Sequence, residues 1–115
     1  MNIERLAGSA AGRSSGVAFD NLVFAVATAR DKSGDLRAQT KDALAFLDES
    51  LAKLGTDKSR LLSVTVYITD MSKKAEMNAA WLDWVDPKNP PQRACIGVVL
   101  EGRDLVEIVA CAARK

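Results

Sequence analysis

Two charged residues stand within the apolar C-terminal part of the chain. Arg93 opens the run 93–100, and Glu107 lies inside the segment Val106-Glu107-Ile108-Val109. A charge in apolar surroundings costs free energy unless it is paired or faces solvent or a ligand. Each residue alone can therefore be an exposed edge residue, half of an intrachain salt bridge, or part of a functional site.

Together the two side chains suit the binding of a small acid and the attack of water on it. The planar guanidinium of Arg93 can hold a carboxylate through two parallel hydrogen bonds, and it stays charged. The carboxylate of Glu107 can orient or activate a water molecule. The pair predicts hydrolysis of a small acid that is already reactive, and it does not suit cleavage of a stable amide.

The composition argues against several other kinds of chemistry. The 115 residues include no histidine, which removes Ser-His-Asp and Cys-His mechanisms and the commonest metal ligand. The two cysteines, Cys95 and Cys111, lie in separate apolar runs and are expected to be buried free thiols. We therefore expect no metal site, no disulfide and no cofactor.

Charge and hydropathy limit the partners and the location of the chain. Sixteen Lys and Arg residues against 15 Asp and Glu give a net charge of +1, which argues against nucleic acid or a membrane surface as partner. No apolar run approaches the length that crosses a membrane, and no signal peptide is recognised. We expect one soluble cytoplasmic domain over residues 1–115.

The hydrophobic pattern predicts two helices that position these residues. The first covers Asp35 to Leu54, with Ser33 or Asp35 as its cap and Gly55 after its end. The second lies near Lys73 to Val85. Each carries an apolar stripe at helical spacing, formed by Leu44, Leu47, Leu51 and Leu54 in the first and by Met77, Ala80, Trp81 and Trp84 in the second.

Six strands are predicted around the helices: Ile3 to Leu6, Val17 to Phe19, Leu22 to Ala27, Leu62 to Ile68, Arg93 to Leu100 and Leu105 to Ala113. The fourth alternates, with Leu62, Val64, Val66 and Ile68 on its apolar side. The order β-β-β-α-β-α-β-β describes an α+β domain, a six-stranded mixed sheet with two helices packed on one face. The other face then needs a cover, which further copies of the chain would supply.

The last two strands are predicted to form a hairpin with its turn at 101–104. In that register Glu107 lies opposite residue 97 or 98, and Arg93 is then roughly 13–17 Å away along the strand. That separation is too long for a direct contact within one hairpin. The two side chains are instead expected to meet across a boundary between two copies of the chain.

Five segments occur in an order that is characteristic of a known family. They are Gln39-Thr40, residues 64–71, Met77-Asn78, Pro91-Gln92-Arg93-Ala94-Cys95 and Val106-Glu107-Ile108. Over roughly residues 17–113 the chain resembles the RidA/YjgF family of reactive-intermediate deaminases. The resemblance implies a chorismate-mutase-like fold and a homotrimer with clefts between subunits. It also implies hydrolysis of 2-imino or enamine acids to 2-oxo acids and ammonia.

The resemblance also implies roles for individual residues. Arg93 corresponds to the carboxylate-binding arginine and Glu107 to the glutamate that positions water, and the backbone of Cys95 contributes to the same cleft. Active members carry Ser-Gly-Gln at the end of the early strand, where this chain has Val26-Ala27-Thr28. Ala27 and Thr28 are thus expected to line the substrate cleft, with a hydroxyl moved to Thr28.

Two functions are consistent with these residues. The first is a hydrolytic deaminase of reactive 2-imino and enamine carboxylic acids. The second is a non-catalytic trimer that binds small carboxylates or a protein partner, and the altered segment 26–28 favours it. A mutase on the same fold ranks below both, because the sequence lacks a dense group of cations for a dicarboxylate.

Overall fold

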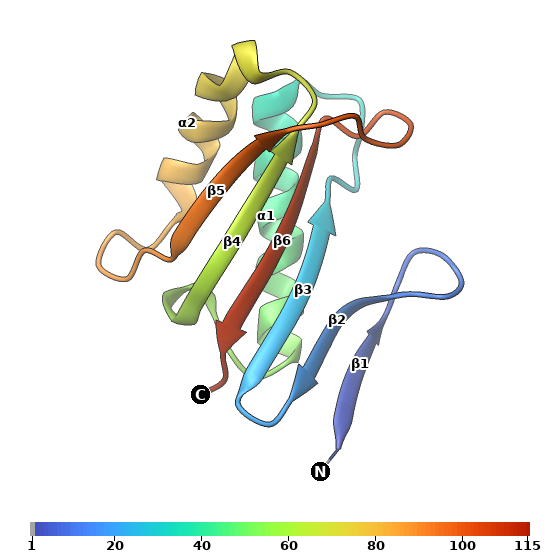
Figure 1. The fold of residues 1–115 in the computed structure, drawn as a ribbon, viewed down its shortest axis with the longest axis vertical. Helices are drawn as coiled ribbons and strands as arrows, with labels where there is room; N and C mark the ends of the chain where they lie inside the picture. Colours follow the sequence, from blue (N-terminus) through green and yellow to red (C-terminus); the bar gives the residue numbers. More distant parts are fainter. Residues whose placement is uncertain (1) are drawn as a thin grey trace.

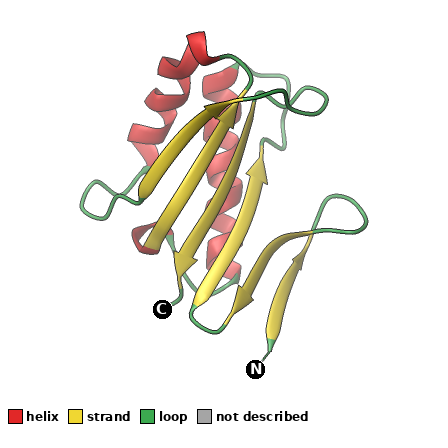
Figure 2. Ribbon diagram, viewed as in Figure 1, coloured by secondary structure: helices red, strands yellow, loops and turns green. Residues whose placement is uncertain are grey.

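Six strands, two helices and two short 3-10 helices make up the computed structural model, which describes residues 2–115 (Figures 1 and 2). The elements are β1 (Ile3–Ala7), β2 (Ser14–Phe19), β3 (Leu22–Thr28), α1 (Leu36–Lys53), η1 (Lys58–Arg60), β4 (Leu61–Ile68), η2 (Met71–Lys73), α2 (Lys74–Trp84), β5 (Gln92–Gly97) and β6 (Val106–Ala113). The predicted fold class and element order are confirmed. Within the described residues, no helix is long and apolar enough to span a bilayer.

Helix α1 forms where the leucine stripe predicts it. Asp35 is its cap, and the Asp35 carboxylate accepts a hydrogen bond of 2.9 Å from the backbone N–H of Ala38. Just after the helix, Gly55 has a φ of +83°, a conformation that residues with a Cβ rarely adopt. The stripe is fully buried and consists of Leu44, Leu47, Leu51 and Leu54.

The strands form one sheet in the order β1-β2-β3-β6-β4-β5. Only β4 and β5 are parallel; the other neighbours are antiparallel. Both helices pack on the same face, behind the sheet in Figure 1. That face of β3, β4 and β6 is buried, and we call it the helix face. No element of the described residues covers the opposite face, and we call it the open face.

The predicted C-terminal hairpin is wrong, because β4 lies between β5 and β6. Strand β4, helix α2 and strand β5 form a strand-helix-strand unit, which places β5 beside β4 and parallel to it. Strand β6 then occupies the other side of β4, antiparallel to it and to β3. The connecting segment crosses the end of β4, where the Val98 N–H donates to the Ile68 carbonyl at 3.0 Å.

The predicted apolar side of β4 also needs one correction. Leu62 is 50% exposed, whereas Leu61 is 5% exposed and belongs to the core. The pairing of β4 with β6 shifts register between Leu61 and Ser63. An extra residue at such an irregularity moves the following side chains to the other face. Val64, Val66 and Ile68 lie on the helix face as predicted.

A buried glutamine fixes the loops at the upper end of the sheet. The Gln39 side-chain amide donates to the carbonyl oxygens of Lys32 and Arg103, both at 3.1 Å. Its oxygen accepts from the N–H of Leu105 at 3.0 Å. These bonds join the loop before α1 to the loop before β6. They therefore set the start of β6, the strand that carries Glu107.

Candidate functional site

Arg93 lies on the edge strand β5 and points to the helix face. It pairs in register with Val64, a core residue. Its guanidinium carbon lies 5.3 Å from the ring centre of Trp81, and its Nη1 lies 3.7 Å from the sulfur of Met77. Within the described residues Arg93 forms no salt bridge. Arg93 is thus a half-buried cation that pairs with no carboxylate of the described residues.

Glu107 lies on the open face, in a row that crosses four strands. It is opposite Thr28 of β3 on one side and Tyr67 of β4 on the other. Tyr67 is in turn opposite Ile96 of β5. The Glu107 carboxylate therefore stands between strands that carry a hydroxyl and a phenol on the same face. Such neighbours can hold a water molecule beside a carboxylate.

One chain does not bring Arg93 and Glu107 together. Arg93 faces the helices and Glu107 faces away from them, as their register partners Val64 and Tyr67 establish. The two are also separated by two strands sideways and three residues lengthwise, roughly 10 Å in each direction. The predicted hairpin placed Glu107 opposite residue 97 or 98, and this register is wrong because β4 lies between the two strands. The expectation that Arg93 and Glu107 do not meet within one chain agrees with the structure.

The other predicted site residues are divided between the two faces. Thr28 lies beside Glu107 on the open face. Ala27 is 1% exposed and packs in the core beside Ile108, so only its backbone is left to line a cleft. Cys95 is half-buried and points to the helix face. Cys95 and Cys111 are both free thiols, half-buried rather than fully buried as expected.

The open face around Glu107 is apolar. Its strands expose large side chains that lie in adjoining rows: Leu22, Phe24, Val26, Ile96 and Val109. Cys111 lies among them, opposite Phe24, and burial raises the pKa of its thiol. A contiguous apolar face of this kind marks a surface that another molecule covers.

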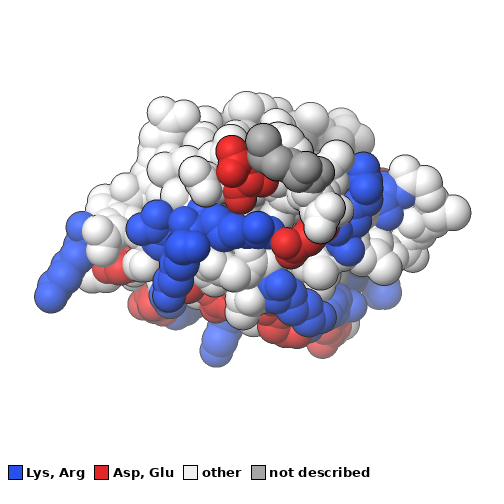
Figure 3. All heavy atoms as spheres, turned by 90° about the horizontal axis from the view of Figure 1, so that it is seen from below, with Lys and Arg blue, Asp and Glu red and all other residues white. Residues whose placement is uncertain are grey.

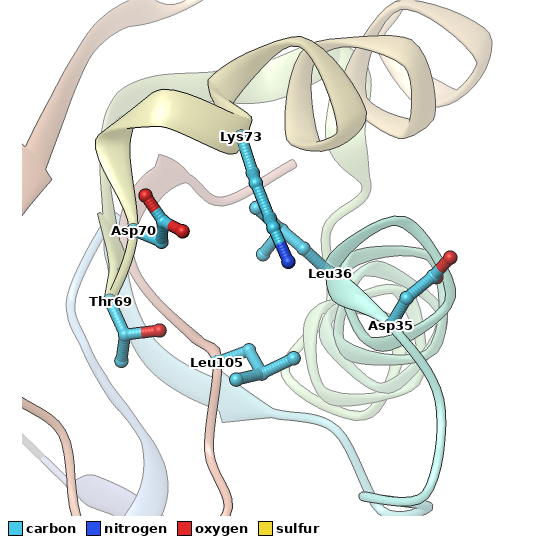
Figure 4. A pocket seen from close by; sticks show the side chains of 6 residues that line it. All are labelled: Asp35, Leu36, Thr69, Asp70, Lys73 and Leu105. Atoms are coloured by element: carbon cyan, nitrogen blue, oxygen red, sulfur yellow. The ribbon is translucent and has the colours of Figure 1, made fainter.

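A hollow of about 220 Å³ lies between the start of α1 and the end of β4. Its lining residues are Asp35, Leu36, Thr69, Asp70, Lys73 and Leu105, and Figure 4 shows the Lys73 side chain running into it. The carboxylate of Asp70 accepts from the N–H and the hydroxyl of Ser72, which lowers its pKa. Asp35 caps α1. Both acids therefore have local structural roles, and none of the predicted site residues lines the hollow.

The lower end of the molecule carries charges of both signs. Figure 3 shows basic and acidic side chains side by side there. Arg114 pairs with Glu4 at 3.0 Å, and Lys115 pairs with Asp57 at 2.5 Å. Hydrogen bonds from Lys115 and Ser59 lower the pKa of Asp57 to about 2. These pairs match the balanced net charge, and they form no uniformly basic surface of the kind that binds a phosphate backbone.

Two aromatic neighbours of the site did not emerge from the sequence as site residues. Trp81 contacts Arg93, and Tyr67 shares the row of Glu107. Trp81 belongs to the apolar stripe of its helix, which predicted only a core role. Tyr67 alternates with the buried residues of its strand, and that alternation was the signal for its place on the open face.

Comparison with known proteins gives consistent similarities. Residues 7–114 match the family model described as Endoribonuclease L-PSP. A RutC family protein from Haemophilus ducreyi is 46% identical over 91 residues, 78% of each chain. The solved structure of NMB1025 from Neisseria meningitidis, described as a member of the YjgF protein family, has a TM-score of 0.93 and 32% identity. It covers 100% of this chain, which covers 97% of it.

Proposed function

The chain belongs to the YjgF/RutC family, whose model is that of Endoribonuclease L-PSP, and on this premise we propose that it is a cytoplasmic hydrolytic deaminase of reactive 2-imino and enamine carboxylic acids. The products are the 2-oxo acid and ammonia. The family description names an endoribonuclease. The balanced charge of this chain and its lack of histidine favour the small acid over RNA.

The proposal rests on the observation that Arg93 is half-buried and forms no salt bridge within the described residues. A half-buried guanidinium without a salt bridge among the described residues has its N–H donors available to an anion. A carboxylate that pairs with it would be fixed in orientation by two parallel hydrogen bonds. The imine carbon next to that carboxylate is then presented in one direction only.

Glu107 supplies the second half of the chemistry. Its carboxylate accepts a proton from a water molecule as the water oxygen bonds to the imine carbon. The nitrogen is protonated and leaves as ammonia when the carbon–nitrogen bond breaks, and the oxygen remains as the new carbonyl. Overall, one imine and one water give one 2-oxo acid and one ammonia. Thr28 and Tyr67 lie beside Glu107 and are placed to hold the water.

The site is proposed to form between subunits of a homotrimer. Arg93 and Glu107 lie on opposite faces of one sheet, so a single chain cannot present both to one substrate. The apolar open face needs a cover, and another copy supplies the cover together with the missing arginine. Sedimentation of the purified chain measures the number of copies directly.

The direct test is the release of ammonia from freshly generated 2-iminopropanoate. The purified protein should accelerate release above the rate in buffer at the same pH. A rate equal to the buffer rate, with folded and assembled protein, rejects the deaminase.

Replacing Glu107 by glutamine is expected to lower kcat by about 10²–10⁴-fold, the usual contribution of a general base. The amide keeps the size of the side chain and removes its ability to take a proton, so KM should change much less than kcat. Steady-state kinetics with 2-iminopropanoate measure both. A variant with wild-type kcat would contradict the role of Glu107.

Mixing two inactive variants tests whether the site lies between subunits. Arg93→Ala and Glu107→Gln chains, unfolded together in equal amounts and refolded, should regain about a quarter of wild-type activity. Random assembly around a closed ring gives one site in four an intact Arg93 from one chain and an intact Glu107 from the next. Each variant refolded alone is the control. A mixture as inactive as its components would place the site within one chain.

The segment Val26-Ala27-Thr28 supports a second candidate, a trimer that binds carboxylates without turnover. Val26 exposes an apolar side chain in the row next to Glu107, where a hydroxyl would assist chemistry. Calorimetry with a panel of 2-oxo and 2-hydroxy acids distinguishes the candidates. Binding without any ammonia release favours the binding module, and no binding to the panel leaves a protein partner.

A further inference from the structure

The guanidinium of Arg93 rests on an aromatic platform. Its central carbon lies 5.3 Å from the ring centre of Trp81 on helix α2, and Nη1 reaches the Met77 sulfur at 3.7 Å. Met77 and Trp81 are four residues apart, so they lie on the same face of the helix. Both are buried. One face of helix α2 therefore contacts the head group of Arg93 through two side chains.

The Trp81 ring packs against a second tryptophan that is bonded to helix α1. The ring of Trp81 lies 5.6 Å from that of Trp84, tilted by 47°. The indole N–H of Trp84 donates to Asp48 of helix α1 at 2.8 Å. Lys58 covers the same Trp84 ring at 5.1 Å. Trp81 is thus supported by contacts between the two helices in addition to its contact with Arg93.

This support leaves the hydrogen-bonding capacity of the arginine largely free. Attraction between a cation and an aromatic face stabilises the charge without using an N–H group. A thioether sulfur is only a weak acceptor. A salt bridge within the chain would instead occupy the same N–H groups that bind a carboxylate. The surroundings of Arg93 therefore restrict where the head group lies while its strong donors stay available.

We propose that Trp81 is a positioning residue, which holds the guanidinium of Arg93 in the orientation that binds the substrate carboxylate. The inference rests on the proposed function in taking a 2-oxo or 2-imino carboxylate as the group that Arg93 binds. Without the indole, the long arginine side chain samples other rotamers and must be ordered again each time a carboxylate binds. Loss of the indole should therefore weaken carboxylate binding more than it slows the chemical step, since Trp81 does not touch the reacting atoms.

The experiment measures binding of 2-oxobutanoate, a stable carboxylate of the product class, by calorimetry. Trp81→Leu should weaken the Kd roughly tenfold, and Trp81→Phe should keep most of the affinity because a phenyl face also attracts the cation. Leu82→Ala is the matched control: Leu82 lies on the same helix but is 72% exposed, and the Kd of this variant should stay within about twofold of the wild type. In turnover, Trp81→Leu should raise KM more than it lowers kcat.

A spectroscopic reading covers the case in which Trp81→Leu does not fold. The chain has two tryptophans, so Trp84→Phe leaves Trp81 as the single indole. Saturation with 2-oxobutanoate should change its fluorescence, and the same addition to the Trp84→Phe/Arg93→Ala double variant should not. An unchanged emission of Trp84→Phe on saturation with 2-oxobutanoate overturns the inference, as does a folded Trp81→Leu with wild-type Kd.

The two hypotheses fail in different ways. If Arg93→Ala binds 2-oxobutanoate as the wild type does, Arg93 is not the carboxylate site, and both the proposed function and the role of Trp81 are rejected. If Arg93→Ala abolishes binding while Trp81→Leu leaves it intact, the proposed function stands and only the positioning role is rejected.

Discussion

Replacing Arg93 by alanine is expected to reduce kcat/KM for 2-iminopropanoate by at least about a hundredfold. The substitution removes two charge-assisted hydrogen bonds, each contributing about 1.5–3 kcal/mol, and every 1.4 kcal/mol corresponds to a factor of ten in rate. The proposed mechanism offers no other cation for the carboxylate. Arg93→Lys keeps the charge and loses the planar fork of donors, so its kcat/KM should fall between that of the wild type and that of Arg93→Ala.

The measurement is ammonia release under conditions where substrate is below KM, corrected for the rate in buffer. Arg37→Ala is the matched control, because Arg37 is an exposed arginine on helix α1 whose pairing with Asp83 is loose, at 3.7 Å. It should leave kcat/KM within about twofold of the wild type. Circular dichroism verifies that the Arg93 variants are folded. An Arg93→Ala enzyme with wild-type kcat/KM would remove Arg93 from the site.

The largest effect on stability is expected at Leu47. Its side chain is 0% exposed in the middle of helix α1, packed within the core beneath the sheet. Alanine at this position leaves a cavity and loses apolar burial, and such substitutions lower the free energy of unfolding by about 2–5 kcal/mol. Alanine is the best helix former, so helix propensity does not add to the loss. The expected decrease in the free energy of unfolding therefore measures the loss of core packing and apolar burial alone.

Urea unfolding followed by circular dichroism measures this cost at one fixed chain concentration, because the proposed assembly would make apparent stability concentration-dependent. Leu82→Ala is the control: Leu82 is also a helical leucine, but it is 72% exposed on helix α2. Its substitution should change the free energy of unfolding by no more than about 0.5 kcal/mol. Equal losses in the two variants would contradict the assignment of Leu47 to the core.

Helices and their limits were predictable because their signals are local. The leucine stripe, the capping carboxylate of Asp35 and the left-handed Gly55 all act within a few residues of the helix they shape. The resemblance to a family rested on short segments in order, and the matching model over residues 7–114 confirms it. The sequence likewise predicted that the helices cover only one face of the sheet, and within the described residues only one face is covered.

The pairing of the C-terminal strands was not predictable in the same way. A short connection between two apolar runs favours a hairpin locally. Helix α2 instead returns the chain parallel to β4, and β6 takes the remaining side of that strand. This choice depends on contacts between distant residues. The order of elements offered a signal for it, since a strand-helix-strand sequence usually gives adjacent parallel strands.

The sequence by itself determined which residues are proposed to carry the chemistry: a guanidinium at 93 and a carboxylate at 107 in an apolar setting, without histidine. Only the tertiary structure decided where they point. Side chains alternate between the faces of a sheet, so a face is fixed by register, and register is fixed by which strands pair. Here the pairing turns Arg93 onto Trp81 and Glu107 onto the open face. That separation is the physical reason why the proposed site requires a second copy of the chain.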